Sequence, residues 1–183
     1  TASANATWVA RSHRSWGGKE RHGSNEKEER TDLLLDALEL KPGMVVADIG
    51  AGTGYLSRRM ARLVAPSGRV LAVDVQPEMV ALLRQAAEAE GMRNITPSLG
   101  TENDARLAPG SVDLAIMVDV YHELSAPYEM LRSVVQSLAP GGRVVFVEYK
   151  AEDPAVQIKQ LHKMTERQIR REAEILPLQW VRT

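Results

Sequence analysis

VVADIGAGTG, the stretch at residues 45–54, decides the fold that we predict for this chain. An apolar run ends at Asp48 and Ile49 and passes directly into a turn that contains Gly50, Gly52 and Gly54. Glycines let a backbone approach a ligand closely, and the start of the helix that follows offers unpaired N–H groups. The stretch therefore predicts a strand, a ligand-binding turn and a helix, in that order.

The alternation of short apolar runs and amphipathic stretches continues beyond this turn, which favours a parallel sheet built from βαβ units. We expect the chain to form a Rossmann-like, doubly wound α/β fold with helices on both faces of the sheet. The predicted strands cover residues 44–49, 69–73, 94–99, 112–118 and 143–149, and the predicted helices cover 25–40, 54–65, 77–90, 126–138, 155–164 and 165–175. Residues 176–183 are expected to begin a sixth strand.

Composition and length indicate one globular domain preceded by an arm. The chain has 183 residues, a formal net charge of −1 and no cysteine. The balanced charge argues against recruitment of nucleic acid or an anionic membrane, and no apolar run reaches the roughly 20 residues of a membrane span. The lack of cysteine excludes disulfides and a cysteine nucleophile. We expect an N-terminal arm or flap over residues 1–24, with Trp8 and Trp16 as anchors, and a single domain over 25–183.

Two acidic residues at strand ends narrow the class of ligand. The glycine spacing is G-x-G-x-G, and Tyr55 stands where a dinucleotide-binding pattern has its third glycine. A carboxylate at Asp48 would repel a pyrophosphate and attract an ammonium group, and Asp74 ends the next strand, where it can accept both hydroxyls of a ribose. A nucleoside with a cationic, amino-acid-like tail fits these features, and S-adenosylmethionine is such a molecule. A nicotinamide dehydrogenase fits them poorly.

Four motifs in order resemble those of class I S-adenosylmethionine-dependent methyltransferases. They are DIGAGTG at 48–54, LAVD at 71–74, NDA at 103–105 and LAPGG at 138–142, and the likeness covers about 33–149. It implies that Asp104 accepts from the adenine amino group and that S-adenosylhomocysteine is the product. The cofactor-binding candidates are Asp48, Gly50, Ala51, Gly52, Gly54, Asp74, Val75, Asn103, Asp104, Ala105 and Val118.

The resemblance also implies a seven-stranded sheet whose last two strands form a hairpin with one antiparallel strand. This chain offers five strands and then only residues 176–183, so we expect the C-terminal closing strand to be missing. An open sheet edge exposes unpaired N–H and C=O groups, which makes a homodimer or strand exchange more favourable.

Polar side chains gather where the predicted strands 112–118 and 143–149 end. The catalytic candidates are Tyr121, His122, Glu148 and His162. His122 or His162 is expected to act as a general base on the methyl acceptor. Two histidines and two glutamates also suit a divalent metal, but no motif spacing brings His162 to His122, so we assign no metal ligand. In a purely structural alternative, Glu123 caps the next helix and His162 packs beside Ile158 and Leu161.

The acceptor is less well defined than the cofactor. Methylation at carbon 5 of a pyrimidine normally needs a cysteine, and the Asp/Asn-Pro-Pro-aromatic turn of enzymes acting on base amines is absent after the fourth strand. The residues at 118–123 and 162–165 resemble a small bacterial branch of the superfamily with mostly unassigned substrates. We expect a small-molecule acceptor, docked under the arm, and a cytoplasmic enzyme, since the methyl donor is a cytosolic metabolite. A protein or RNA acceptor, or a non-catalytic cofactor-binding protein, is the alternative.

Overall fold

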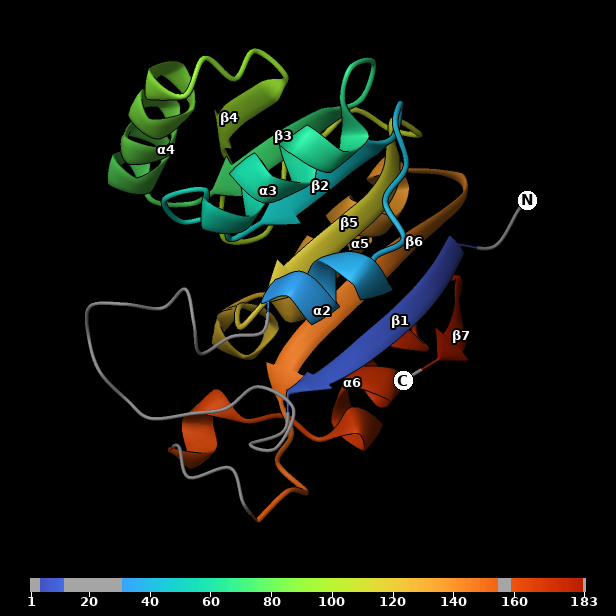
Figure 1. Ribbon diagram of the computed structural model, residues 1–183. Helices are drawn as coiled ribbons and strands as arrows, with labels where there is room; N and C mark the ends of the chain where they lie inside the picture. Colours follow the sequence, from blue (N-terminus) through green and yellow to red (C-terminus); the bar gives the residue numbers. More distant parts are fainter. Residues whose placement is uncertain (1–3, 12–30, 155–158, 183) are drawn as a thin grey trace.

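The computed structural model describes residues 4–11, 31–154 and 159–182, and its centre is a seven-stranded sheet (Figure 1). The strand order is β4-β3-β2-β5-β6-β1-β7, and neighbouring strands pair in parallel. The strands are β1 (Ala4–Arg11), β2 (Val45–Ile49), β3 (Arg69–Asp74), β4 (Ile95–Leu99), β5 (Val112–Val118), β6 (Leu138–Tyr149) and β7 (Leu178–Arg182). The five strands predicted between residues 44 and 149 are confirmed.

Helices cover both faces of the sheet, as predicted for a doubly wound fold. They are α2 (Thr31–Ala37), α3 (Tyr55–Val64), α4 (Pro77–Ala89), α5 (Pro127–Ser137) and α6 (Glu166–Ala173), with single 3₁₀ turns η1 (Tyr121–Glu123) and η2 (Gln160–His162). One core cluster joins α2, α3 and α4 to the sheet, and the other joins α5 and α6 to it. In α3 the buried residues recur with helical period at Ser57, Met60, Ala61 and Val64.

Alternate residues of the strands contribute to the core on opposite faces of the sheet. In β6, Val144 and Phe146 belong to the cluster under α5 and α6, whereas Val145 and Val147 belong to the cluster under α2, α3 and α4. Successive side chains of a strand point to opposite faces, so a strand covered on both sides is apolar at every position. This explains why the central strands read as continuous apolar runs.

Two predicted helices differ from the structure. The region predicted as helix 155–164 contains no α-helix among its described residues, 159–164; it holds the 3₁₀ turn η2 and, at Met164, an isolated β-bridge to Lys150. Of the helix predicted at 25–40, residues 25–30 lie outside the described residues, and α2 forms the described part only as far as Ala37, three residues short of the predicted end. The helix predicted to begin at Thr165 is confirmed, because the Thr165 hydroxyl accepts a hydrogen bond from the Gln168 amide at 3.0 Å, as an N-cap requires.

The sheet has seven strands, so the expectation that it would lack a strand is wrong, although the additional strand comes from the N-terminal segment and not from the C-terminal one. Residues 178–182 form the predicted sixth strand, β7, and within the described residues no strand follows it. The position between β6 and β7 is nevertheless filled, because β1 pairs with β6 from Asn5 opposite Arg143 to Arg11 opposite Tyr149, and pairs with β7 on its other side (Figure 1). A strand there satisfies backbone groups that β6 would otherwise leave unpaired.

The antiparallel hairpin implied by the resemblance is also not observed among the described strands. Strands β1 and β7 pair in parallel. A hairpin needs two strands joined by a short turn, whereas β1 and β7 lie at opposite ends of this sequence and are free to pair in the other direction.

The predicted N-terminal arm is only partly described. Its residues 4–11, including Trp8, form β1 within the sheet, so this part is not a flap. The rest of the arm, with Trp16, lies outside the described residues. The domain boundary at residue 24 therefore stays a prediction.

Candidate functional site

The glycine loop that joins β2 to α3 is shaped by three residues with positive φ. Gly50, Gly52 and Gly54 have φ of +73°, +54° and +79°, in the left-handed region that favours glycine. A Cβ at Gly54 would lie 2.6 Å from Leu83 Cγ, and a Cβ at Gly50 would overlap the side chain of Val120. A Cβ at Gly52 meets nothing within 4 Å. The loop is thus held tightly at both ends and open in the middle, where a ligand can approach.

Asp48 lies in β2 immediately before this loop, and it is 3% exposed. The Ser57 hydroxyl, on the first turns of α3, donates a hydrogen bond of 2.5 Å to its Oδ2. The pKa of Asp48 is raised to about 6, mainly by burial; the hydrogen bonds from Ser57 oppose this shift, and the negative charge of Asp74 contributes to it. A cation placed beside Asp48 would therefore relieve an unfavourable buried charge.

Asp74 ends β3 and holds the neighbouring backbone through both carboxylate oxygens. Its Oδ2 accepts from the Gly52 amide at 2.8 Å, and its Oδ1 accepts from the Gln76 amide at 2.9 Å. Each carboxylate oxygen has a second lone pair, so these bonds leave acceptor capacity for a ligand. The bond to Gly52 was not predicted from the sequence, and it ties the predicted ribose ligand to the glycine loop.

The segment after β4 carries the next group of predicted cofactor residues. Asp104 Oδ1 accepts from the Arg106 amide at 2.7 Å and from the Ser133 hydroxyl at 2.8 Å, and these bonds, the Arg106 amide first, lower the pKa of Asp104. The Ala105 amide donates to Ser133 Oγ at 3.0 Å, and Ala105 is fully buried. Asn103 accepts a hydrogen bond from the Thr101 hydroxyl. Ser133 fixes this segment and was missed by sequence reasoning, because it lies on α5, far along the chain.

The remaining cofactor candidates follow strand ends at the same edge. Ala51 donates its amide to the Val73 carbonyl, Val75 follows β3 and is 46% exposed, and Val118 ends β5 and is partly buried. The predicted cofactor residues therefore all lie at or just beyond the carboxyl ends of β2 to β5, where open α/β sheets bind ligands.

A second group of polar side chains is built around Glu148 of β6, whose side chain is fully buried. Its Oε2 lies 2.6 Å from His122 Nδ1, and its Oε1 accepts from the backbone amide of Tyr121 at 2.8 Å and from that of His122 at 3.4 Å. A buried carboxylate needs such partners. The hydrogen bond with Glu148 raises the pKa of His122, although partial burial opposes this shift.

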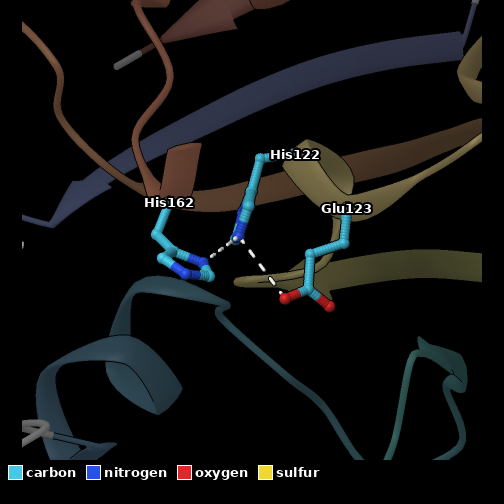
Figure 2. A group of neighbouring side chains, drawn as sticks. All are labelled: His122, Glu123 and His162. Atoms are coloured by element: carbon cyan, nitrogen blue, oxygen red, sulfur yellow. Dashed lines mark hydrogen bonds and ion pairs between the residues drawn. The ribbon is translucent and has the colours of Figure 1, made fainter. Parts of the chain in front are cut away.

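His162 reaches the far side of the same imidazole. His122 Nε2 lies 3.3 Å from His162 Nδ1 and 3.7 Å from Glu123 Oε1 (Figure 2). The two rings meet edge to face, with centroids 5.4 Å apart. The structure thus brings together His122 of η1, Glu148 of β6 and His162 of η2, although no sequence motif connects these three segments.

Other side chains near this cluster behave differently from the sequence expectations. Tyr121 contributes only its backbone amide to Glu148, and its buried ring packs edge-on against Phe146 at 4.9 Å. Burial, together with the negative charge of Glu172, raises the pKa of Tyr121. Glu123 gives no cap to α5, whose first turn has no side-chain cap. Leu161 is 84% exposed and Ile158 lies outside the described residues, so the packing suggested for His162 has no support.

Val120 connects the two groups of residues. Its side chain fills the space that a Cβ at Gly50 would take, and it precedes Tyr121 and His122 directly in the chain. The glycine loop and the His122 cluster are therefore neighbours at one edge of the sheet. No helix in the described part of the chain is long and apolar enough to cross a membrane.

Comparisons with known proteins agree with this geometry. Residues 46–142, more than half of the chain, match the family described as "Methyltransferase domain". The chain is 35% identical over 118 residues to a protein-L-isoaspartate O-methyltransferase of Aeropyrum pernix and 32% identical over 115 residues to a ubiquinone biosynthesis O-methyltransferase of Xanthomonas euvesicatoria. These matches cover 61% and 63% of this chain but only 41% and 46% of the relatives, so the chain spans less than half of their length.

A solved structure extends the likeness to most of the chain. The crystal structure of a SAM-dependent methyltransferase from Aquifex aeolicus matches with a TM-score of 0.73 and 27% identity. The match covers 79% of this chain and 77% of that chain. The chain therefore belongs to the methyltransferase-domain family and has the Rossmann-like fold of class I S-adenosylmethionine-dependent methyltransferases.

Proposed function

We propose that this protein transfers the methyl group of S-adenosylmethionine to a small-molecule acceptor and releases S-adenosylhomocysteine. The observation that carries the proposal is the position of the Glu148-bound His122 beside the glycine loop, through the contact of Val120 with Gly50. A cofactor loop and a side chain able to take a proton are then neighbours at one edge of the sheet.

The glycine loop and the strand-end carboxylates hold the cofactor. The ammonium group pairs with Asp48, whose buried charge has no cationic partner among its described contacts. The ribose hydroxyls donate to Asp74, and Gly52 allows close approach of the ligand. Asp104 accepts from the adenine amino group. The other residues that line this cofactor site are Gly50, Ala51, Gly54, Val75, Asn103, Ala105 and Val118.

The acceptor docks at the carboxyl ends of β5 and β6, against His122. A lone pair of its oxygen or nitrogen attacks the methyl carbon, and the electrons of the breaking carbon–sulfur bond go to the sulfonium sulfur, which becomes a thioether. Such a displacement depends mainly on alignment, with reacting atoms about 3–3.5 Å apart. The proton of the acceptor goes to His122 Nε2. Glu148 fixes the ring by accepting from Nδ1–H and stabilises the imidazolium that forms.

Two observations support a small acceptor. The positive and negative charges of the chain nearly balance, and the proposed acceptor site consists of a few side chains around His122. The two curated relatives named above differ in acceptor, since one name refers to a protein and the other to ubiquinone biosynthesis. A protein or RNA acceptor is therefore the main rival. We place the enzyme in the cytoplasm, where the methyl donor is supplied. A homodimer stays a prediction, with β7 as the exposed strand at which it would form.

The proposal is tested by two measurements, one of cofactor binding and one of methyl transfer. Calorimetry with S-adenosylhomocysteine, and with NAD as the matched control, should show binding of the first ligand only. Purified protein is then incubated with labelled S-adenosylmethionine and with separate pools of small metabolites, protein and RNA. Label entering the small-molecule pool supports the proposal, whereas label in protein or RNA alone contradicts the choice of acceptor. Binding without label transfer to any pool contradicts catalysis.

A cofactor-bound structure tests the proton-transfer step separately. A base must reach its proton directly or through one water, so a His122 Nε2 more than about 8 Å from the sulfonium methyl group would exclude the base role.

A further inference from the structure

We infer that His122, Glu123 and His162 form a binding site for a divalent transition-metal ion of the zinc class. The inference goes beyond the proposed methyl transfer, because binding of the ion needs neither cofactor nor acceptor. Each residue offers one ligand atom, and the three atoms lie within 4.8 Å of one another (Figure 2).

The spacing of the two imidazole nitrogens is that of ligands on one tetrahedral ion. Zinc–nitrogen bonds of about 2.0–2.1 Å at tetrahedral angles place two ligand atoms about 3.3–3.4 Å apart. His122 Nε2 and His162 Nδ1 are 3.3 Å apart. The spacing of the two nitrogens therefore already suits an ion between them. Glu123 Oε1 lies 3.7 Å from His122 Nε2, and the three ligand atoms are spread over as much as 4.8 Å, so the exposed Glu123 side chain must rotate to bring its oxygen to the ion.

Glu148 supplies the support that metal-bound histidines usually have. A ligating histidine typically donates its other ring N–H to a carboxylate, which fixes the tautomer and makes the ligand more basic. His122 Nδ1 lies 2.6 Å from the fully buried Glu148, so the ring presents the lone pair of Nε2 toward His162 and Glu123. The backbone amides of Tyr121 and His122 hold Glu148 in turn.

The donor set selects the class of ion. Two imidazoles and one carboxylate suit zinc and its first-row neighbours, whereas magnesium and calcium prefer oxygen ligands only. Three protein ligands leave one position of a tetrahedral ion for a water or a ligand oxygen, the arrangement of zinc sites that bind exchangeable ligands. Glu123 and His162 are exposed, so this position faces solvent.

The ion and the proton compete for the same lone pair. A metal ion on His122 Nε2 occupies the atom that the proposed base uses, so an enzyme with the ion bound cannot use His122 as a base. A direct hydrogen bond from His162 Nδ1–H to His122 Nε2 explains the same 3.3 Å distance without a metal, and the experiment must separate these two explanations.

The experiment titrates zinc into the full chain after treatment with a chelator and dialysis. We expect one equivalent to bind, and cobalt to give the visible absorption bands of a low-symmetry site. His162→Ala should weaken zinc binding at least 10-fold, because one of three ligands is lost. Glu148→Gln should weaken zinc binding about 10–100-fold, because the carboxylate that orients the His122 ring is lost. The variant His13→Ala/His22→Ala is the matched control and should bind zinc like the unaltered protein.

Two results would overturn the inference: no zinc bound by the unaltered chain, or the same affinity in His162→Ala. His162 is exposed, so that variant keeps the test valid if Glu148→Gln fails to fold. Calorimetry with S-adenosylhomocysteine on the same samples separates the two proposals. Cofactor binding without zinc binding rejects only the metal site, and zinc binding without cofactor binding rejects only the proposed function.

Discussion

The glycine loop and the His122 cluster lie at the same edge of one sheet, but they are built differently. In the loop, backbone amides make most of the contacts, as where the Gly52 amide donates to Asp74, 22 positions further along the chain. In the cluster, side chains from η1, β6 and η2 contact one another across 26 to 40 positions of the chain. The comparison indicates that backbone groups supply most contacts in the cofactor half of the site, whereas side chains contact one another in the acceptor half.

The largest effect that we expect comes from the side-chain half. His122→Ala should lower turnover by about 10²–10⁴-fold and leave cofactor affinity little changed, because the base is lost but the loop is intact. The measurement is the rate of S-adenosylhomocysteine release with an acceptor identified in the screen, per mole of protein that binds cofactor. If His122 is only structural, the variant will instead melt at a lower temperature and keep nearly normal activity per folded molecule.

The contact between the two halves can be broken at Gly50. Gly50→Ala forces a Cβ into Val120 and places a side chain at φ +73°, so it should lower the free energy of unfolding by about 2–5 kcal/mol, the combined cost of left-handed strain and overpacking. Gly91→Ala is the matched control, since Gly91 has φ +66° but no atom within 4 Å of an added Cβ. Urea unfolding of both variants measures the difference. Equal losses would mean that the Val120 contact contributes nothing.

The backbone-built half is tested at Asp74. Asp74→Ala should weaken S-adenosylhomocysteine binding by about 2–3 kcal/mol, the cost of hydrogen bonds to a charged group. Asp113 Oδ2 also accepts a backbone amide, that of Val45 at 2.8 Å, at the other end of β2. Asp113→Ala should therefore cost stability without changing cofactor affinity. Calorimetric titration of both variants checks this, and unchanged affinity in Asp74→Ala would contradict the assignment of the ribose site.

The smallest expected effect is a pH dependence of cofactor binding. Burial raises the pKa of Asp48 to about 6, and only the charged carboxylate pairs with an ammonium group. Below that pKa a proton must leave before the cofactor binds, so affinity should fall by up to about tenfold per pH unit as the pH drops. Calorimetry at pH 7 and pH 5 measures the change. Asp48→Asn should bind the cofactor weakly at both pH values. If this variant keeps the pH dependence of the unaltered protein, the group that titrates is not Asp48.

The glycine loop could be predicted from the sequence more completely than the His122 cluster. The loop, the five central strands and the acidic residues at 48 and 74 were readable, because glycine spacing and apolar runs are local signals. Ser57 lies nine residues after Asp48, on the predicted helix, and that placement could have pointed to it as a partner. Ser133 and the approach of His162 to His122 depend on how α5 and η2 pack, which no local pattern records.

The strand β1 was missed for a related reason. Residues 4–11 read ANATWVAR, a short segment with no sustained period to mark it as part of a parallel sheet. Its role is defined by a place in the sheet beside β6, which is distant in sequence. Local sequence patterns do not identify such a strand, because its place in the sheet depends on the edge of β6 and not on its own residues.

The place of β1 between β6 and β7 has a consequence for the order of folding. Strand β7 has no other neighbour in the sheet, so it can join only after the first and last segments of this sequence have met. Contacts between such distant segments form slowly, because the loop they close must lose its entropy first. The β2–β6 nucleus can assemble from adjacent βα units beforehand. A ribosome-bound chain would hold β1 unpaired until β6 has emerged, and during that interval the backbone groups of β1 are open to pairing with other chains.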